Sequence, residues 1–158
     1  MLDQNFPVQA EPLPWPPFLR VSRLSSVEPD LVSEPDDWRI LLALDRRGDV
    51  RGFVTNDGGI LSSPREMVVL QRTKQFLVVA ERVGHDAIRA TGLIMTHLVP
   101  IARQVDGRPA VFRLRPGQVP RQNLDSLLNQ IANHLSVSPR ELSKGERQAL
   151  RDEYGVNL

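Results

Sequence analysis

The residues whose types and spacing best support a chemical role are four bases near the end of the sequence. Arg140, Lys144, Arg147 and Arg151 follow one another at intervals of four, three and four residues. In an α-helix this spacing places all four side chains on one face, where they repel one another. A row of cations on one helical face suits contacts with the phosphates of a nucleic acid. We therefore expect these four residues to bind nucleic acid if the segment is helical.

Strong local signals predict that helix. Ser138-Pro139-Arg140-Glu141 has the form of a capping box with proline at the first helical position. The Ser138 hydroxyl can accept from the Glu141 amide, while the Glu141 carboxylate accepts from the Ser138 amide. Gly155 suits the left-handed residue that follows a helix. The sequence therefore predicts a helix from Pro139 to about Tyr154.

A second amphipathic helix precedes it. One apolar stripe with the spacing of a helix begins soon after Pro120, so this helix should start near Asn123. The stripe consists of Leu124, Leu127, Leu128, Ile131, Ala132 and Leu135. Residues 120–158 are therefore expected to form a C-terminal helical hairpin.

Residues 124–154 resemble the helix-turn-helix DNA-binding module. The resemblance rests on a small residue in the first helix (Ala132), on Leu135 and Val137 around the turn, and on the apolar Leu142 in the second helix. It implies that the second helix enters the major groove of double-stranded DNA. No family resemblance is evident in the rest of the chain.

The segment departs from that module at three points. Ser136 occupies the turn position that is usually glycine, although serine tolerates a positive φ poorly. Gly145 lies inside the predicted second helix and costs up to about 1 kcal/mol relative to alanine. The module normally has a third helix, and residues 155–158 are too few to form one. The alternative is a plain helical hairpin that packs on the main domain and exposes its basic face to water.

Composition excludes several classes of function. The 158 residues include no cysteine, which excludes disulfides and thiolate metal sites. The uncharged stretch from Ala90 to Ala102 is too short to span a bilayer. The first residues lack the layout of a signal peptide, so we expect a cytoplasmic protein with no membrane partner. The three histidines have no paired metal-ligand spacing, and we expect no metal and no cofactor.

Charge is unevenly distributed along the chain. The net charge is +1, but residues 1–60 carry 10 acids and 6 bases, whereas residues 61–158 carry 9 acids and 14 bases. This distribution favours either a polyanion bound by the second part or head-to-tail self-association into a homo-oligomer. Of the 20 bases 18 are arginine, which suits phosphate recognition but is equally explained by the codon usage of a GC-rich genome.

Residues 1–37 are predicted to form an extended arm. They contain 7 of the 13 prolines, which disfavour helix and sheet interior. Trp15 and Phe18 are large apolar groups for a free tail. We therefore expect the arm to dock through these two residues, either on its own domain or on a partner.

Residues 38–116 are predicted to be the core domain. Residues 38–45 and 50–55 read as two strands of a hairpin, joined at Arg46-Arg47-Gly48-Asp49. Residues 63–83 are ambiguous, since the Ser63-Pro64-Arg65-Glu66 capping box favours a helix but the distribution of apolar residues favours two buried strands, the reading we prefer.

The remainder of the core domain reads more simply. Residues 86–104 predict one long amphipathic helix capped by Asp86, and residues 110–115 predict a further strand. The fold class is therefore α+β, with an antiparallel sheet of four to five strands and helices on one of its faces.

These expectations lead to two alternative hypotheses for the function of the protein. The first is a non-enzymatic, nucleic-acid-associated regulatory or accessory protein, which contacts DNA through Arg140, Lys144, Arg147 and Arg151 and dimerises through its sheet. The second is an adaptor or assembly subunit of a larger protein complex that uses Trp15 and Phe18. No phosphate-loop glycine pattern, nucleophile elbow or zinc-enzyme motif is present, so no catalytic residue is predicted.

Overall fold

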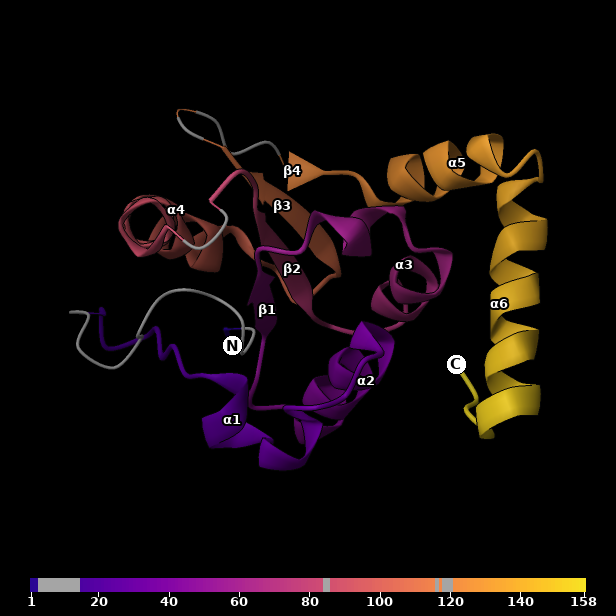
Figure 1. Cartoon of the computed structure of the whole chain (residues 1–158), viewed down its shortest axis with the longest axis horizontal. Helices are drawn as coiled ribbons and strands as arrows, with labels where there is room; N and C mark the ends of the chain where they lie inside the picture. The colour runs from indigo at the N-terminus through magenta and orange to yellow at the C-terminus, as the bar shows by residue number, and fades with distance from the viewer. Residues whose placement is uncertain (3–14, 84–85, 116, 118–120) are drawn as a thin grey trace.

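The computed structural model describes residues 1–2, 15–83, 86–115, 117 and 121–158. Helices surround a small sheet on both faces, and the α5–α6 pair forms one end of the molecule (Figure 1). In chain order the elements are α1 (Leu24–Val27), η1 (Pro29–Leu31), α2 (Asp37–Arg47), β1 (Gly52–Thr55), η2 (Gly58–Ser62), α3 (Pro64–Leu70), β2 (Phe76–Ala80), α4 (Ala87–Gln104), β3 (Ala110–Leu114), β4 (Arg121–Gln122), α5 (Leu124–His134) and α6 (Pro139–Tyr154).

Within the described residues the sheet has four strands in the order β1-β2-β3-β4 and is mostly parallel. Strand β2 runs parallel to both β1 and β3, with Phe53 opposite Leu77 and Leu77 opposite Val111. Only β4 is antiparallel to its neighbour β3. The antiparallel sheet expected from the sequence is therefore wrong for three of the four strands. The cause is α3, because a helix between two strands returns the chain to the edge where the first strand began.

Hydrophobic clusters on both faces of the sheet hold the fold together. One face, with Phe53, Leu77 and Val111, packs against α2, α3, α5 and α6. The other face, with Val78 and Phe112, packs against α4. The strands are consequently buried on both sides, as parallel strands usually are. The expectation of helices on one face only is wrong.

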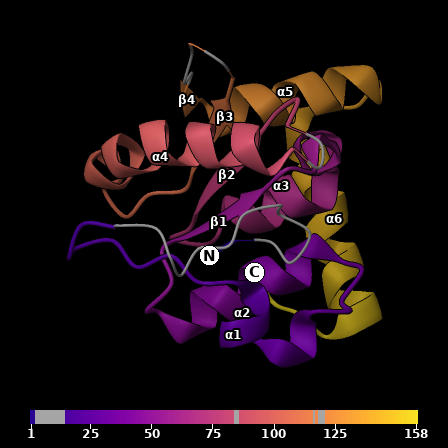
Figure 2. The same ribbon diagram turned by 60° about the vertical axis from the view of Figure 1, so that its left-hand side comes forward.

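The two crossovers between the parallel strands have opposite hands. Strands β1, β2 and β3 lie in sequential order, so two crossovers of the same hand would place α3 and α4 on the same face. They lie on opposite faces of the sheet (Figures 1 and 2). One crossover is therefore left-handed, although about 98 % of such connections are right-handed.

Residues 37–47 form a helix where the sequence favoured a strand. Helix α2 buries Trp38, Ile40, Leu41 and Leu44. It has Asp37 in its first turn and ends at Gly48, whose φ of 73° is left-handed. The expected hairpin is wrong in its first strand, and Gly48 ends a helix instead of turning a hairpin. The second strand of that hairpin corresponds to β1.

The ambiguous segment 63–83 contains one helix and one strand. Helix α3 starts directly after Ser63, whose hydroxyl donates to the Glu66 carboxylate. Residues 76–80 form β2, with every residue buried. The preferred reading of two strands is wrong for the first half of the segment. Helix α4 and strand β3 confirm the predictions for residues 86–104 and 110–115, including the cap at Asp86, which accepts from the amides of Ile88 and Arg89.

The described part of the N-terminal segment lies on its own domain and is only partly extended. Val21 and Leu24 are buried, and Trp15 and Leu19 pack against the cluster on the α4 face. Residues 24–27 and 29–31 form short helices, so the expected extended path is wrong for them. Residues 3–14 of the predicted arm lie outside the described residues.

Candidate nucleic-acid interface

Both helices of the C-terminal pair start on side-chain caps. The Asn123 side-chain oxygen accepts from the amides of Asp125 at 2.8 Å and Ser126 at 3.3 Å. At the start of α6, the Glu141 amide donates to the Ser138 hydroxyl at 3.2 Å, and the Ser138 amide donates to the Glu141 carboxylate at 3.0 Å. The predicted capping box is therefore confirmed. Gly155 follows α6 with a φ of 66°, as expected.

The turn between the helices contains a serine in a left-handed conformation. Ser136 has a φ of 57°, a left-handed conformation that serine adopts at a cost. The Val137 amide donates to the Ala132 carbonyl at 3.0 Å and so closes the end of α5. Four residues, 135–138, separate α5 from α6, which is within the length typical of this motif. A strained serine therefore replaces the expected glycine.

A third helix completes the pair, and it comes from upstream in the sequence. Helix α3 packs against both α5 and α6. Its Met67, Val68 and Leu70 belong to the same buried cluster as Ile131 and Leu142. The core that a two-helix segment lacks is thus supplied by residues 64–70. The signal for this helix was the Ser63 capping box.

The four predicted nucleic-acid-binding residues share one outward face of α6. Arg140, Lys144 and Arg151 are exposed and Arg147 is partly exposed, whereas the buried side of the helix carries Leu142 and Leu150. The Arg147 Nε donates to the Ser143 carbonyl at 2.9 Å and the Arg151 Nε donates to the Asn157 side chain at 3.0 Å. Among the described residues, none of the four basic residues forms an ion pair with a carboxylate.

Two acidic residues of α6 lie on the inner side of the helix and are paired there. The Arg65 Nε of α3 lies 3.1 Å from the Glu146 carboxylate, and an Arg65 terminal nitrogen lies 3.6 Å from that of Glu153. The helix therefore separates its charges, with these acids turned toward α3 and the four bases turned away from it. We name the group Arg140, Lys144, Arg147 and Arg151 the basic stripe.

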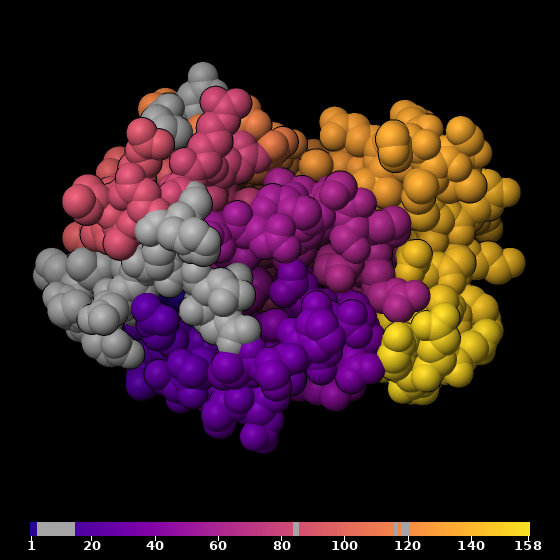
Figure 3. Space-filling model, viewed as in Figure 1, coloured from indigo at the N-terminus to yellow at the C-terminus, as the bar shows by residue number. Residues whose placement is uncertain are grey.

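The predicted partner-binding residues lie away from the basic stripe. In the space-filling view of Figure 3, α5 and α6 (orange to yellow) form one end of the molecule, and α4 (pink) lies toward the other. Trp15 is half-buried against the cluster on the α4 face. Phe18 is 57 % exposed, with the Arg103 guanidinium 5.3 Å from the centre of its ring. The two predicted sites are therefore on opposite faces of the sheet.

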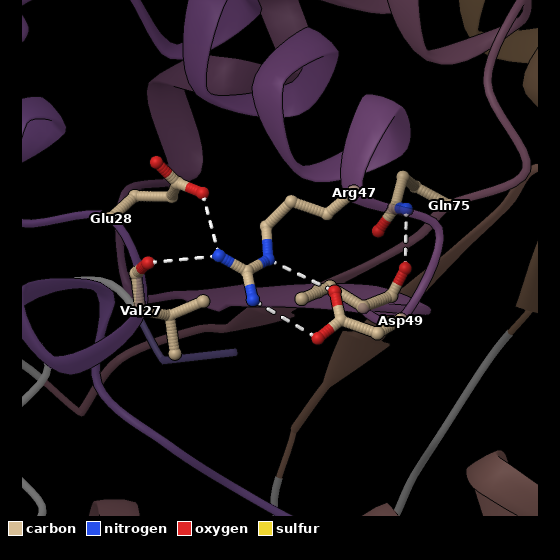
Figure 4. Close-up of polar contacts among 6 residues, drawn as sticks. Val27, Glu28, Arg47, Asp49 and Gln75 are labelled. Carbon is tan, nitrogen blue, oxygen red and sulfur yellow. Dashed lines mark hydrogen bonds and ion pairs between the residues drawn. The ribbon is translucent and has the colours of Figure 1, made fainter.

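One charged site was not found by sequence reasoning. The Arg47 guanidinium donates to both carboxylate oxygens of Asp49 at 2.9 and 3.1 Å, to the Glu28 carboxylate at 2.9 Å and to the Val27 carbonyl at 3.1 Å (Figure 4). Hydrogen bonds with Asp49 and Glu28 raise the pKa of Arg47, and the bond with Arg47 lowers the pKa of Asp49. These contacts lie beside a cavity of about 420 Å³. No motif joins these residues, because Glu28 and Arg47 are 19 positions apart.

The carboxyl ends of β2 and β3, where open α/β sheets usually bind ligands, carry an ion cluster of one carboxylate and two guanidiniums. Glu81 accepts from both Arg113 and Arg115. Burial opposes ionisation of Glu81, but the hydrogen bonds from Arg115 and Arg113 prevail and lower its pKa. These contacts join the end of β2 to the end of β3, and we assign the cluster a structural role.

Other chemistry has little support in the described part of the chain. No group of three or more histidine, aspartate or glutamate side chains that could hold a metal ion occurs there. His97 is half-buried on α4 and His134 is exposed on α5. His85 lies outside the described residues. Within the same residues, no helix is long and apolar enough to cross a membrane.

Comparisons with known proteins add no relative. No protein-family model matches the chain, and neither curated proteins nor solved structures give a significant match.

Proposed function

We propose that this chain is a non-enzymatic, DNA-associated regulatory or accessory protein whose helix α6 enters the major groove of a duplex. Helix α5 would cross the sugar-phosphate backbone, in the way that the first helix of a helix-turn-helix module does. The basic stripe would contact phosphates and base edges.

One observation carries this proposal: the basic stripe is exposed and has no carboxylate partner among the described residues, while Glu146 and Glu153 of the same helix are paired with Arg65. A surface helix that served only to cover the core would gain from mixed charges on its outer face. On α6 the four cations of the basic stripe instead repel one another, which costs stability unless a polyanion binds there. The four-residue turn between α5 and α6 and the contacts of α3 with both helices also support the proposal.

The direct test is a salt titration of duplex DNA binding, followed by fluorescence anisotropy. Binding to B-DNA weakens with a slope of log Kobs against log salt of about −0.9 for each phosphate contact, so a stripe of this size predicts a slope of about −3 to −4. A steep slope of this kind supports the proposal. Absence of binding at about 50 mM salt contradicts it.

An adaptor function is the second candidate, and a different surface favours it. On α4, Ile88 is 86 % exposed and Met95 is 37 % exposed, and their spacing of seven residues places both on one face of the helix. Large exposed apolar side chains on one helix are typical of protein interfaces. Removing residues 1–36 would not test this candidate fairly, because Val21 and Leu24 are buried.

A sharper test replaces Ile88 and Met95 with serine and measures the solution mass by analytical ultracentrifugation. The adaptor candidate predicts an assembly in the original protein that the double variant loses. A monomer of the same mass in both proteins removes self-assembly through α4 from consideration.

A further inference from the structure

The cavity beside Arg47 lies at the amino ends of β1 and β2, opposite to the usual ligand-binding end of a parallel sheet. Gly52 and Phe76, the first residues of these strands, line it together with Leu98 and Ala102 of α4. Its volume of about 420 Å³ is within the range that small-molecule sites occupy, about 300 to 1,000 Å³. It is on the α4 face of the sheet, away from the basic stripe.

The inner walls of the cavity are apolar. Val54 and Phe76 contribute from the sheet, and Leu98 and Val105 contribute from α4 and its end. Leu19 of the N-terminal segment forms part of another wall and packs on the same hydrophobic cluster. A ligand seated here would bury a hydrocarbon body, because hydrophobic side chains form most of the surface that it meets.

The rim of the cavity is cationic. Arg20, Arg47 and Arg51 line it, and Asp49 is the one carboxylate that lines it among the residues that the structure describes. Arg47 is already neutralised by Asp49 and Glu28. The guanidinium groups of Arg20 and Arg51 are exposed and form no hydrogen bond or ion pair within the described part of the chain, although the Arg51 backbone carbonyl accepts from the Phe76 amide at 2.9 Å. Counting Glu28, the described side chains of the rim combine three guanidiniums with two carboxylates, which leaves one positive charge among them.

We propose that this cavity binds a small amphipathic monoanion, namely a carboxylate on an unbranched hydrocarbon chain. The carboxylate would lie at the rim between Arg20 and Arg51, where arginine can hold it with two parallel hydrogen bonds. The hydrocarbon chain would extend between Phe76 and the helix positions Leu98 and Ala102. This site does not depend on DNA binding by α6.

The hydrogen bonds of Arg47 hold one side of the rim in place. Four hydrogen bonds join this guanidinium to Asp49, Glu28 and the Val27 carbonyl. They connect α1, the end of α2 and the start of β1, which are three of the segments around the cavity. Because four of its five N–H groups are engaged by these partners, Arg47 positions the rim, and the recognition of the anion falls to Arg20 and Arg51.

The test uses the full chain labelled with ¹⁵N and three probes of equal chain length: octanoate, 1-octanol and octylammonium. Amide chemical shifts are followed at millimolar probe concentrations. Octanoate should shift the amides of Gly52, Phe76 and Ala102 and bind at least fivefold more tightly than octanol, while octylammonium should bind weakest. Lengthening the carboxylate should tighten binding about fourfold for each methylene, the transfer value for a buried CH₂, until the cavity is filled.

Two variants separate charge from shape. Arg20→Gln with Arg51→Gln should reduce octanoate affinity to that of octanol and leave octanol binding unchanged. Ala102→Phe should abolish the shifts for all three probes, because it fills the cavity from α4. Arg46→Gln is the matched control, since Arg46 is exposed and does not line the cavity.

Several outcomes overturn the proposal. Equal binding of octanoate and octylammonium would show that the arginines do not select charge. Octanoate shifts that persist in a folded Ala102→Phe protein would place binding elsewhere, and absence of shifts with all probes would mean that the cavity takes no such ligand. The folded state of each variant is read from the dispersion of the same spectra.

Discussion

The rings of Trp38 and Tyr154 lie 5.0 Å apart at an interplanar angle of 58°, and they join the first turn of α2 to the last turn of α6. The Arg39 guanidinium lies 5.0 Å from the centre of the Tyr154 ring, and that of Arg65 lies 5.7 Å from it. Helix α6 is thus held along its length, by α5 at its start, by α3 at Arg65 and by α2 at its end. A functional helix needs rigid support of this kind.

Removing the Tyr154 ring should loosen the end of α6. Tyr154→Ala loses one aromatic pair, worth about 0.5–1.5 kcal/mol, and two cation–π contacts at a partly exposed site. We expect a loss of about 1–2 kcal/mol of unfolding free energy in urea denaturation. Tyr154→Phe keeps the ring and should keep most of the stability. Equal losses in both variants would assign the effect to the hydroxyl and not to the ring contacts.

Glycine at position 136 should stabilise the turn. Ser136 holds a φ of 57°, and a non-glycine residue in this region costs about 1–2 kcal/mol. Part of that gain is offset by the greater freedom of glycine in the unfolded chain. Ser136→Gly should therefore raise the unfolding free energy by up to about 1 kcal/mol, measured by chemical denaturation. A loss of stability would mean that residue 136 does not adopt the left-handed conformation.

Two glycines should respond to alanine in opposite directions. A Cβ at Gly145 meets nothing within 4 Å, so Gly145→Ala should add up to about 1 kcal/mol of helix stability. A Cβ at Gly52 would lie 2.4 Å from the Phe76 ring, so Gly52→Ala should cost about 1–3 kcal/mol through overpacking. Thermal melts of both variants check the pair.

Gly145→Ala also carries information on binding. A stabilised variant that still binds DNA shows that the glycine is merely tolerated in the helix. A stabilised variant that loses binding places Gly145 at a close approach of the helix backbone to DNA. Destabilisation would contradict the helical position of residue 145.

Acid should weaken the start of α6. Hydrogen bonds from the Ser138 side chain and backbone lower the pKa of Glu141. A carboxyl group with a lowered pKa in the folded state stabilises that state above its unfolded pKa, and this contribution is lost as the pH falls through the folded pKa. Amide exchange in the first turn of α6 should therefore accelerate, relative to the middle of the helix, as the pH falls below about 4.

Glu141→Gln is the control for that pH dependence. Glutamine can still accept from the Ser138 amide but does not titrate. The variant should show the same first-turn protection at both ends of the pH range. A pH dependence that survives in Glu141→Gln would assign it to another group.

The C-terminal pair was predictable from sequence because its signals are local. The caps at Asn123 and Ser138 and the stripe from Leu124 to Leu135 each specify a helix within a few residues. Helix α2 had comparable signals, namely Asp37, the bases Arg46 and Arg47, and Gly48, but the apolar run Ile40–Leu44 also fits a buried strand. Short apolar runs do not distinguish the two structures by periodicity.

The sheet was mispredicted because one wrong element changed the topology. Reading residues 64–70 as a strand left no helix between β1 and β2. Parallel strands need a long crossover connection, so the short connections that remained predicted antiparallel pairing. The cavity could not be predicted, since its described lining comes from Met1 and from residues within 18–27, 47–54, 76 and 98–105, which only the fold brings together.

If the basic stripe binds DNA, reversing half of its charge should weaken binding, whereas the same reversal elsewhere on the surface should not. Arg147→Glu with Arg151→Glu inverts half of the stripe. Arg89→Glu with Arg108→Glu makes the same change of net charge away from α6, at side chains that are 70 % and 83 % exposed. Duplex affinity is measured for both double variants and the original protein at several salt concentrations.

We expect Arg147→Glu with Arg151→Glu to lose DNA binding and Arg89→Glu with Arg108→Glu to keep it. Inverting two phosphate-contacting positions should lower the magnitude of the salt slope by about 2 and reduce affinity at least a hundredfold at low salt. Both variants should melt near the original temperature, because all four side chains are at the surface. Equal weakening in the two variants, or undiminished binding in Arg147→Glu, Arg151→Glu, would contradict a DNA-binding role for α6.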